Sequence, residues 1–353
     1  MISALEVVPW RARFNQATAV VVLLAGVNLL ACRGTAASDL TGELATGGLV
    51  LTRRADIEMR AEDVYVSPGQ IRVEYRFYNA ASADVTMSVA FPMPDVTVAD
   101  AAARVPLPSD DPQNLLGFST LVDGAPVKAW AVQKAFAQGV DRTADLERLK
   151  VPLAPHLRST DQALSKLRPG DSDELRRLGL AGAEEYRVGG GMRKQLSPRW
   201  TLKTTYLWDQ TFPAGREVAV EHSYMPSVGR STVSPLRNPD AMRPAVLQDY
   251  MRKYCIDQDF IAAIERARQS TRRQDGAPFS EERISYLLAT GPDGARPIGE
   301  FRLVVDKGDP GNLVSFCADG AIKVGPTQIE VRKTAFVPRQ DLHVLILKRQ
   351  GRS

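Results

Sequence analysis

Residues 71–77 carry the clearest pattern in this chain, because apolar and charged side chains alternate there without interruption. A period of two places the apolar side chains on one face of a β-strand and the charged ones in solvent. The same alternation recurs at residues 85–91, and a shorter version at residues 64–66 precedes it. Residues 56–95 therefore predict an antiparallel meander of three half-buried strands.

A second alternating stretch begins at Trp200, and a turn at residues 213–216 leads into a further predicted strand at residues 218–224. The positions that share its apolar face are Trp200, Leu202, Thr204, Tyr206 and Trp208. Between the two alternating stretches, a Ser-x-x-Gln capping box at residues 159–162 precedes apolar residues at helical spacing. The sequence thus predicts a helical insert at about residues 140–190.

The remainder of the chain contains both segments with helical spacing and segments typical of strands. Apolar residues recur at helical spacing in residues 246–264. Further strands are predicted at residues 284–289, 301–305, 314–316, 328–331 and 342–347. The predicted fold class is α+β and mainly β.

The length of 353 residues exceeds what a single hydrophobic core usually serves. A proline-rich stretch at residues 226–244 is the best candidate for a boundary. We therefore expect an antiparallel β-sandwich-like domain at residues 38–243, which carries the helical insert, and a smaller α+β domain at residues 244–353.

The N-terminal residues 1–37 are predicted to be a signal segment. Two arginines precede an apolar run at residues 17–31, which is too short to span a bilayer comfortably. Small residues before Ser38 suit cleavage there and predict a protein in the periplasm or outside the cell. The alternative is the lipobox-like sequence that ends at Cys32, whose lipidation would anchor the protein to a membrane. Neither alternative leaves a transmembrane span.

The chain has three cysteines, which agrees with export. Either cleavage removes Cys32 from the pool of free thiols. The remaining two, Cys255 and Cys317, are most simply explained as one disulfide in an oxidising compartment. This disulfide would tie the α+β domain together.

Several scattered segments resemble a bacterial family known as domain of unknown function 4424. They are residues 45–49, 90–95, 203–206, 222–229, 301–308 and 314–317. The resemblance covers nearly all of the chain after the signal segment. It implies exported bacterial proteins, and it implies no activity.

A second resemblance concerns architecture alone. The order of Phe91-Pro92-Met93-Pro94, Val122-Asp123-Gly124, Lys134-Ala135-Phe136-Ala137 and Phe212-Pro213-Ala214-Gly215 is similar to that in vault-inter-alpha-trypsin type domains. Those domains are extracellular interaction modules with a β-sandwich fold. The helical insert stretches the spacing here, so the resemblance bears on the fold only.

Candidate binding residues come from the aromatic strand and the strand that follows it. Tyr206, Trp208, His222 and Tyr224 would form a platform for a peptide or glycan if they were exposed, and the core of the sheet if they were buried. His222 with Asp209 would also suit a hydrolase, but no nucleophile or orienting group accompanies them. No catalytic residue is therefore assigned.

Other chemistry finds little support in the sequence. Metal-binding spacings such as His-Glu-x-x-His or paired Cys-x-x-Cys are absent, and neither a metal nor a cofactor is predicted. A net charge of +4 without a basic block disfavours nucleic acid. The sequence favours an exported cell-envelope module that binds a protein, peptide or glycan without enzymatic activity. The alternatives are an envelope hydrolase that uses His222 with a nearby carboxylate and a secreted factor that acts on another cell.

Overall fold

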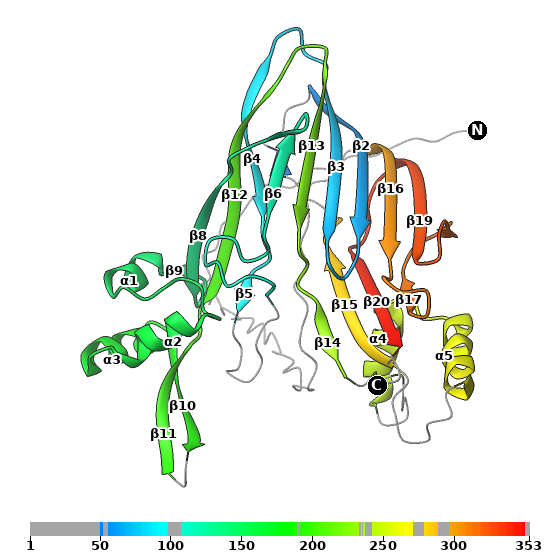
Figure 1. The fold of residues 1–353 in the computed structure, drawn as a ribbon. Coiled ribbons are helices and arrows are strands. Elements are labelled where there is room, and N and C mark those ends of the chain that lie inside the picture. Colours follow the sequence, from blue (N-terminus) through cyan, green and yellow to red (C-terminus); the bar gives the residue numbers. More distant parts are fainter. Residues whose placement is uncertain are drawn as a thin grey trace, which may run out of the picture. The chain divides into compact units, whose positions relative to one another are not determined.

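The computed structural model describes residues 50–51, 56–97, 107–188, 191–232, 234, 236, 242–270, 279–288 and 297–349. The predicted signal segment, with Cys32 and the cleavage site before Ser38, lies outside these residues. Three larger sheets and one hairpin organise the described chain, so the mainly β prediction is confirmed (Figure 1).

An eight-stranded sheet has the order β18-β19-β16-β2-β3-β13-β6-β7. Its strands are β2 (Ile57–Val66), β3 (Ile71–Asn79), β6 (Ser119–Val122), β7 (Ala125–Pro126), β13 (Glu217–Tyr224), β16 (Ile298–Asp306), β18 (Ile322–Lys323) and β19 (Gln328–Phe336). The alternation in β3 is confirmed, since its odd-numbered residues are buried and its even-numbered charged residues are exposed. Neighbouring strands are antiparallel except β16 and β2, which are parallel.

The parallel pair crosses the expected domain boundary, because β2 precedes residue 243 and β16 follows it. One sheet thus contains strands from both expected domains. The division at residues 243 and 244, and the sandwich-like description of the first part, stay predictions.

A six-stranded sheet holds the strand expected to complete the meander. Its members are β1 (Val50–Leu51), β4 (Val85–Pro92), β12 (Thr201–Phe212), β8 (Trp130–Ala137) and β9 (Val140–Asp141) in that order, with β5 (Val96–Thr97) beside β12. The predicted three-strand meander is therefore wrong in one strand: β2 and β3 form a hairpin, but β4 pairs with β12. Alternation shows which face of a strand is buried, but it does not reveal the neighbouring strand.

Asn79 lies at the end of β3, where the chain crosses from the eight-stranded sheet to β4 of the six-stranded sheet. Its side-chain amide donates hydrogen bonds to the backbone oxygens of Ala83, at 3.0 Å, and Phe212, at 2.8 Å. Its side-chain oxygen accepts a hydrogen bond from the backbone N–H of Ala81 at 2.9 Å. A fully buried amide with these partners satisfies backbone groups that a direct hairpin would have paired.

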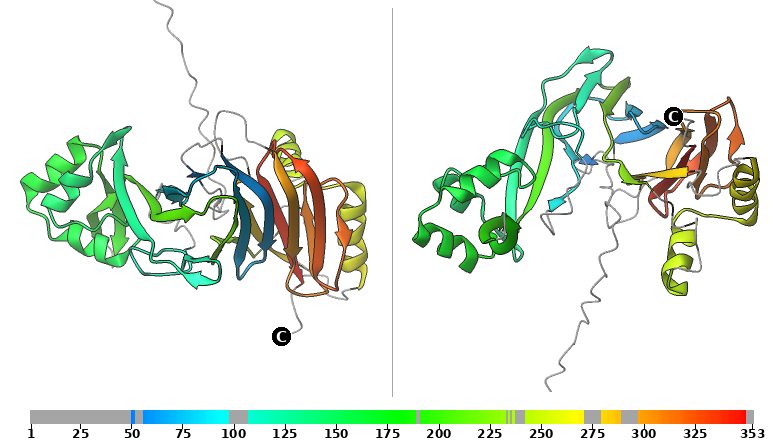
Figure 2. Two further views of the ribbon diagram at one scale, coloured as in Figure 1. Left: turned by 90° about the horizontal axis from the view of Figure 1, so that it is seen from above. Right: turned by 60° about the horizontal axis from the view of Figure 1, so that its bottom comes forward.

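The predicted insert contains helices and a hairpin. The helices α1 (Thr143–Arg148), α2 (Arg158–Ser165) and α3 (Pro169–Arg177) precede the hairpin of β10 (Ala181–Val188) and β11 (Gly191–Pro198). Figure 2 shows these helices in green beside the hairpin, where α2 contacts β11 and α3 contacts β10. Trp200 belongs to the separate core of this insert, and its indole N–H donates to the Leu153 backbone oxygen at 2.7 Å.

A four-stranded sheet completes the described chain in the order β14-β15-β20-β17. Its strands are β14 (Gly229–Ser231), β15 (Phe279–Tyr286), β20 (Leu342–Arg349) and β17 (Leu313–Phe316), accompanied by helices α4 (Pro244–Lys253) and α5 (Gln258–Ser270). The predicted disulfide is confirmed: Cys255, after α4, is bonded to Cys317, after β17. Among the described helices, none has the length and apolar character needed to cross a membrane.

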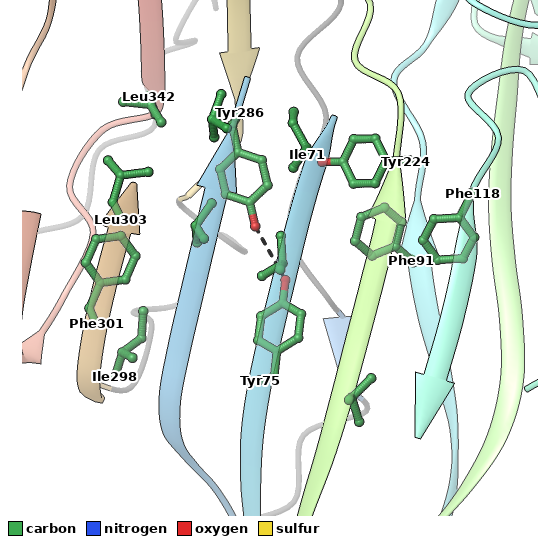
Figure 3. Packing of buried hydrophobic residues seen from close by; sticks show 14 of the residues in the cluster. Ile71, Tyr75, Phe91, Phe118, Tyr224, Tyr286, Ile298, Phe301, Leu303 and Leu342 are labelled. Atoms are coloured by element: carbon green, nitrogen blue, oxygen red, sulfur yellow. Dashed lines mark hydrogen bonds between the residues drawn. The ribbon is translucent and has the colours of Figure 1, made fainter. Parts of the chain in front are cut away.

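The largest core joins side chains of all three larger sheets. Tyr75 and Ile71 of β3, Phe91 of β4 and Tyr286 of β15 lie close together in it (Figure 3). This core holds the three larger sheets together.

Candidate functional site

His222, the residue on which the hydrolase alternative depends, is fully buried in the largest core. The rings of Phe91, Phe118 and Trp208 surround it, with centroids at 4.9, 5.2 and 5.4 Å from the imidazole. Its Nδ1 forms a hydrogen bond of 2.6 Å with the hydroxyl of Thr120. Burial lowers the pKa of His222 to about 3, so the imidazole is neutral at ordinary pH.

Asp209, the carboxylate that the hydrolase alternative pairs with His222, faces the other way. Asp209 lies on the exposed face of β12 and accepts a hydrogen bond from Ser88 at 2.7 Å. Within the described chain, Nε2 of His222 has no hydrogen-bond partner. In the described structure His222 thus lacks the carboxylate partner that would orient it as a general base.

The aromatic residues of the predicted platform are also part of the core. Trp208 and Tyr224 are almost completely buried, and Tyr206 is buried with its hydroxyl donating to the Gln113 backbone oxygen at 2.6 Å. No exposed platform is formed by these residues in the described structure. Binding by Tyr206, Trp208, His222 and Tyr224 stays a prediction, and their burial does not favour it.

An open groove lies instead between the eight-stranded and four-stranded sheets, and we call it the Phe301–Phe336 groove. Its volume is about 470 Å³, within the range of about 300–1,000 Å³ that is usual for ligand pockets. Its apolar lining consists of Leu288, Phe301, Leu303, Val331, Phe336, Val337 and Leu342. Three of these residues, Phe301, Leu303 and Leu342, are visible together in Figure 3.

The end of β19 places Phe336 against Phe301. In a regular strand, Val331, Lys333 and Ala335 would share one face. Ala335 adopts a φ of 48°, which lies in the left-handed region, and this breaks the alternation. As a result Ala335 is exposed, and the Phe336 ring packs on Phe301 with centroids 4.6 Å apart.

Charged side chains line the same groove. Lys333 and Arg339 supply positive charge, and Asp319 and Asp341 supply negative charge. One carboxylate oxygen of Asp341, Oδ1, is buried without a hydrogen-bond partner among the described residues. A buried acceptor without a donor is unfavourable, so Asp341 is a costly residue at the edge of this groove.

Sequence reasoning did not reveal this groove. The strands at residues 301–305 and 328–331 were predicted, but the groove depends on the pairing of β16 with β19 and on the nearby start of β20. The apolar pair Phe336-Val337 after a predicted strand was the available signal.

Two further hollows, of about 800 and 500 Å³, lie on the charged outer face of the eight-stranded sheet. Their charged groups bind one another. Arg302 forms ion pairs with Asp63 at 2.8 Å and Glu330 at 2.7 Å, and Arg76 forms one with Glu300 at 3.2 Å. Because these groups already have partners, this face is the weaker candidate.

In the described part of the chain, no group of three or more His, Cys, Asp or Glu side chains is arranged to hold a metal ion. The Phe301–Phe336 groove is the candidate site.

Comparisons with known proteins place this mainly β chain in a family. The model of the family called domain of unknown function DUF4424 matches residues 37–345, so the chain belongs to that family. No curated protein matches the chain. A solved structure from Legionella pneumophila subsp. pneumophila str. Philadelphia 1, described as a "putative nutrient binding protein", is similar at 15% identity and a TM-score of 0.42 over 88% of this chain and 72% of that one. A likeness this distant carries no argument about the ligand.

Proposed function

We propose that this chain is an exported, non-enzymatic binding module that receives an apolar peptide segment in the Phe301–Phe336 groove. The observation that carries the proposal is the lining of this groove, in which apolar side chains such as Phe336 and Val337 lie beside charges of both signs. Such a site offers apolar surface together with positive and negative side chains at its border.

A peptide suits this arrangement better than a glycan. Phe301 is buried and Phe336 is partly buried and tilted against it, so the pair presents no exposed flat ring for a sugar. A peptide brings apolar side chains for this surface and backbone N–H groups for Asp341. The cations Lys333 and Arg339 add a means of fixing its direction through an acidic side chain or a C-terminal carboxylate.

Panning a random heptapeptide library on the mature protein tests this proposal. We expect enrichment of apolar peptides, and we expect Phe336→Ala to weaken binding of the selected synthetic peptide at least tenfold in calorimetry. Asp341→Asn should weaken it less, since the amide retains an acceptor. Ile322→Ala changes an exposed apolar residue outside the groove and serves as the matched control. Equal enrichment on the Phe336→Ala variant would refute the proposal.

Export is part of the same proposal. The predicted signal segment at residues 1–37 and the Cys255–Cys317 disulfide support it, because stable disulfides form in oxidising compartments. Intact-mass measurement on protein from its own cell envelope tests it. A mass that starts at Ser38 supports a free protein in the periplasm or outside the cell, and a lipid-bearing mass that starts at Cys32 supports an anchored one. An uncleaved chain would refute both.

We propose two domains, a sandwich-like unit at residues 38–243 and an α+β unit at residues 244–353, with the groove in the second. Limited proteolysis of the intact protein tests the division. Preferred cleavage near residue 243 would support it, whereas loss of both fragments together would indicate one cooperative unit.

A further inference from the structure

Strand β8 forms an open edge of the six-stranded sheet (Figure 1). On one side it pairs with β12 along Trp130 to Phe136. On its other side, the short strand β9 reaches only Phe136 and Ala137. The preceding residues of β8 therefore have no strand beside them in the described chain.

The contacts of Ala135 show which backbone groups face this open side. Its carbonyl accepts a hydrogen bond from the Arg142 N–H at 2.8 Å, and its own N–H donates to the Thr143 hydroxyl at 3.0 Å. Both partners lie away from β12. Because backbone direction alternates along a strand, the N–H and C=O groups of Ala131 and Gln133 face the same open side.

The side chains along this edge are unusual for a soluble sheet. Trp130 and Val132 are 47% and 37% exposed, and they lie with Lys134 on one face of β8. An open edge with exposed apolar side chains is the arrangement that another strand adds to most readily. Only Lys134 opposes such pairing, and its ammonium is held by Asp141 at 3.0 Å.

We propose that two copies of this chain pair through β8, antiparallel, with Val132 on the twofold axis. The free edge runs from Trp130 to Lys134, since Thr143 and Arg142 occupy the backbone groups of Ala135. Val132 is its midpoint. In this register Ala131 of one copy and Gln133 of the other exchange both of their backbone hydrogen bonds, and the twofold axis repeats the exchange.

The side chains match in the same register. Val132 lies opposite Val132 of the second copy at a pair without hydrogen bonds, where Cα atoms approach to about 4.5 Å. Trp130 lies opposite Lys134, and this pair occurs twice. An ammonium beside an indole face is a favourable contact. The edge is thus complementary to itself in backbone direction and in side-chain pairing, which favours a second copy over an unrelated partner.

Pairing over so short a segment predicts a weak, concentration-dependent dimer, because stable interfaces bury at least about 1,200 Å². Sedimentation of the mature protein over a concentration series measures this. Val132→Glu and Val132→Lys should each abolish the dimer, because each places like charges opposite each other across the axis. An equimolar mixture of the two variants should restore it as a heterodimer. That restoration is specific to a register in which residue 132 faces itself.

A second measurement checks the contact directly. Val132→Cys should form an intermolecular disulfide under mild oxidation, while Ile322→Cys, on the exposed strand β18, should not. Unchanged circular dichroism of each variant confirms that it folds. A wild-type protein that is monomeric at all concentrations, or a dimer that survives Val132→Glu, would overturn the proposal.

Discussion

Tyr286 of β15 donates a hydrogen bond of 3.3 Å to the carboxyl group of Glu62 on β2, and so connects the four-stranded sheet with the eight-stranded one. The hydroxyl of Tyr75 lies 3.4 Å from that of Tyr286, which extends the connection to β3 (Figure 3). Glu62 is buried among apolar side chains, and burial raises its pKa from 4.5 to about 7.

The protonation of Glu62 should make stability depend on pH. The folded state holds its proton up to about pH 7, whereas the unfolded state releases it near pH 4.5. The contribution is therefore fully present below about pH 4.5 and is lost as the pH rises to about 7, by up to about 3 kcal/mol. Urea unfolding across this range measures the loss. Glu62→Gln should remove it, and Glu58→Gln, at an exposed position of the same strand, should not.

The titration of His222 should make stability depend on pH in the opposite direction to that of Glu62. Its pKa is lowered from 6.5 to about 3. Its contribution is therefore present above about pH 6.5 and is lost as the pH falls toward about 3. The ring nitrogen shifts in NMR should remain those of neutral imidazole at pH 5. An imidazole that titrates near pH 6.5 would contradict the burial described for it.

Gly299 should tolerate no side chain. A Cβ atom there would lie 2.5 Å from the backbone oxygen of Arg60, at the irregularity in the pairing of β2 with β3. Because the backbone cannot yield as a side chain does, Gly299→Ala should lower the free energy of unfolding by about 1–3 kcal/mol. Chemical denaturation measures this. Gly69→Ala, where nothing lies within 4 Å, is the control and should have little effect.

The Cys255–Cys317 disulfide should stabilise the protein. It links residues 62 positions apart, and the chain-entropy model gives about 4 kcal/mol as the stabilisation from closing a loop of that size. Reductant should lower the melting temperature of the wild type. The double variant Cys255→Ser, Cys317→Ser should melt at the lower temperature with or without reductant. Equal melting of the wild type in both conditions would contradict a structural role.

The sequence allowed the strands to be predicted, but it did not reveal their neighbours. Alternation in β3 and β12 reports which side chains share a face, and both faces are as expected. It does not report that the Trp208 face of the six-stranded sheet packs against His222 of the eight-stranded sheet and becomes core. That outcome depends on the crossing at Asn79.

The candidate site was beyond sequence reasoning for a related reason. Phe301 and Phe336 come together because Ala335 leaves the regular strand conformation. An alanine in the sequence does not indicate that the backbone there has a positive φ. Glu62 is similar. Its burial follows from the irregularity near Arg60, which changes the face that the following residues present. Local backbone irregularities thus determine both the Phe301–Phe336 contact and the burial of Glu62. The alternation of apolar and polar residues does not predict such irregularities.

The parallel pairing of β16 with β2 has a consequence for how the chain reaches this structure. The ion pair between Arg302 and Asp63 joins these strands across 239 residues of sequence. Closing so long a loop costs chain entropy before any contact compensates, and contacts of this kind slow folding. The hairpin of β2 and β3 can form early, but its outer edge stays open until β16 arrives. Completion of the eight-stranded sheet is thus a late event, and during synthesis the edge of β2 stays open to wrong partners.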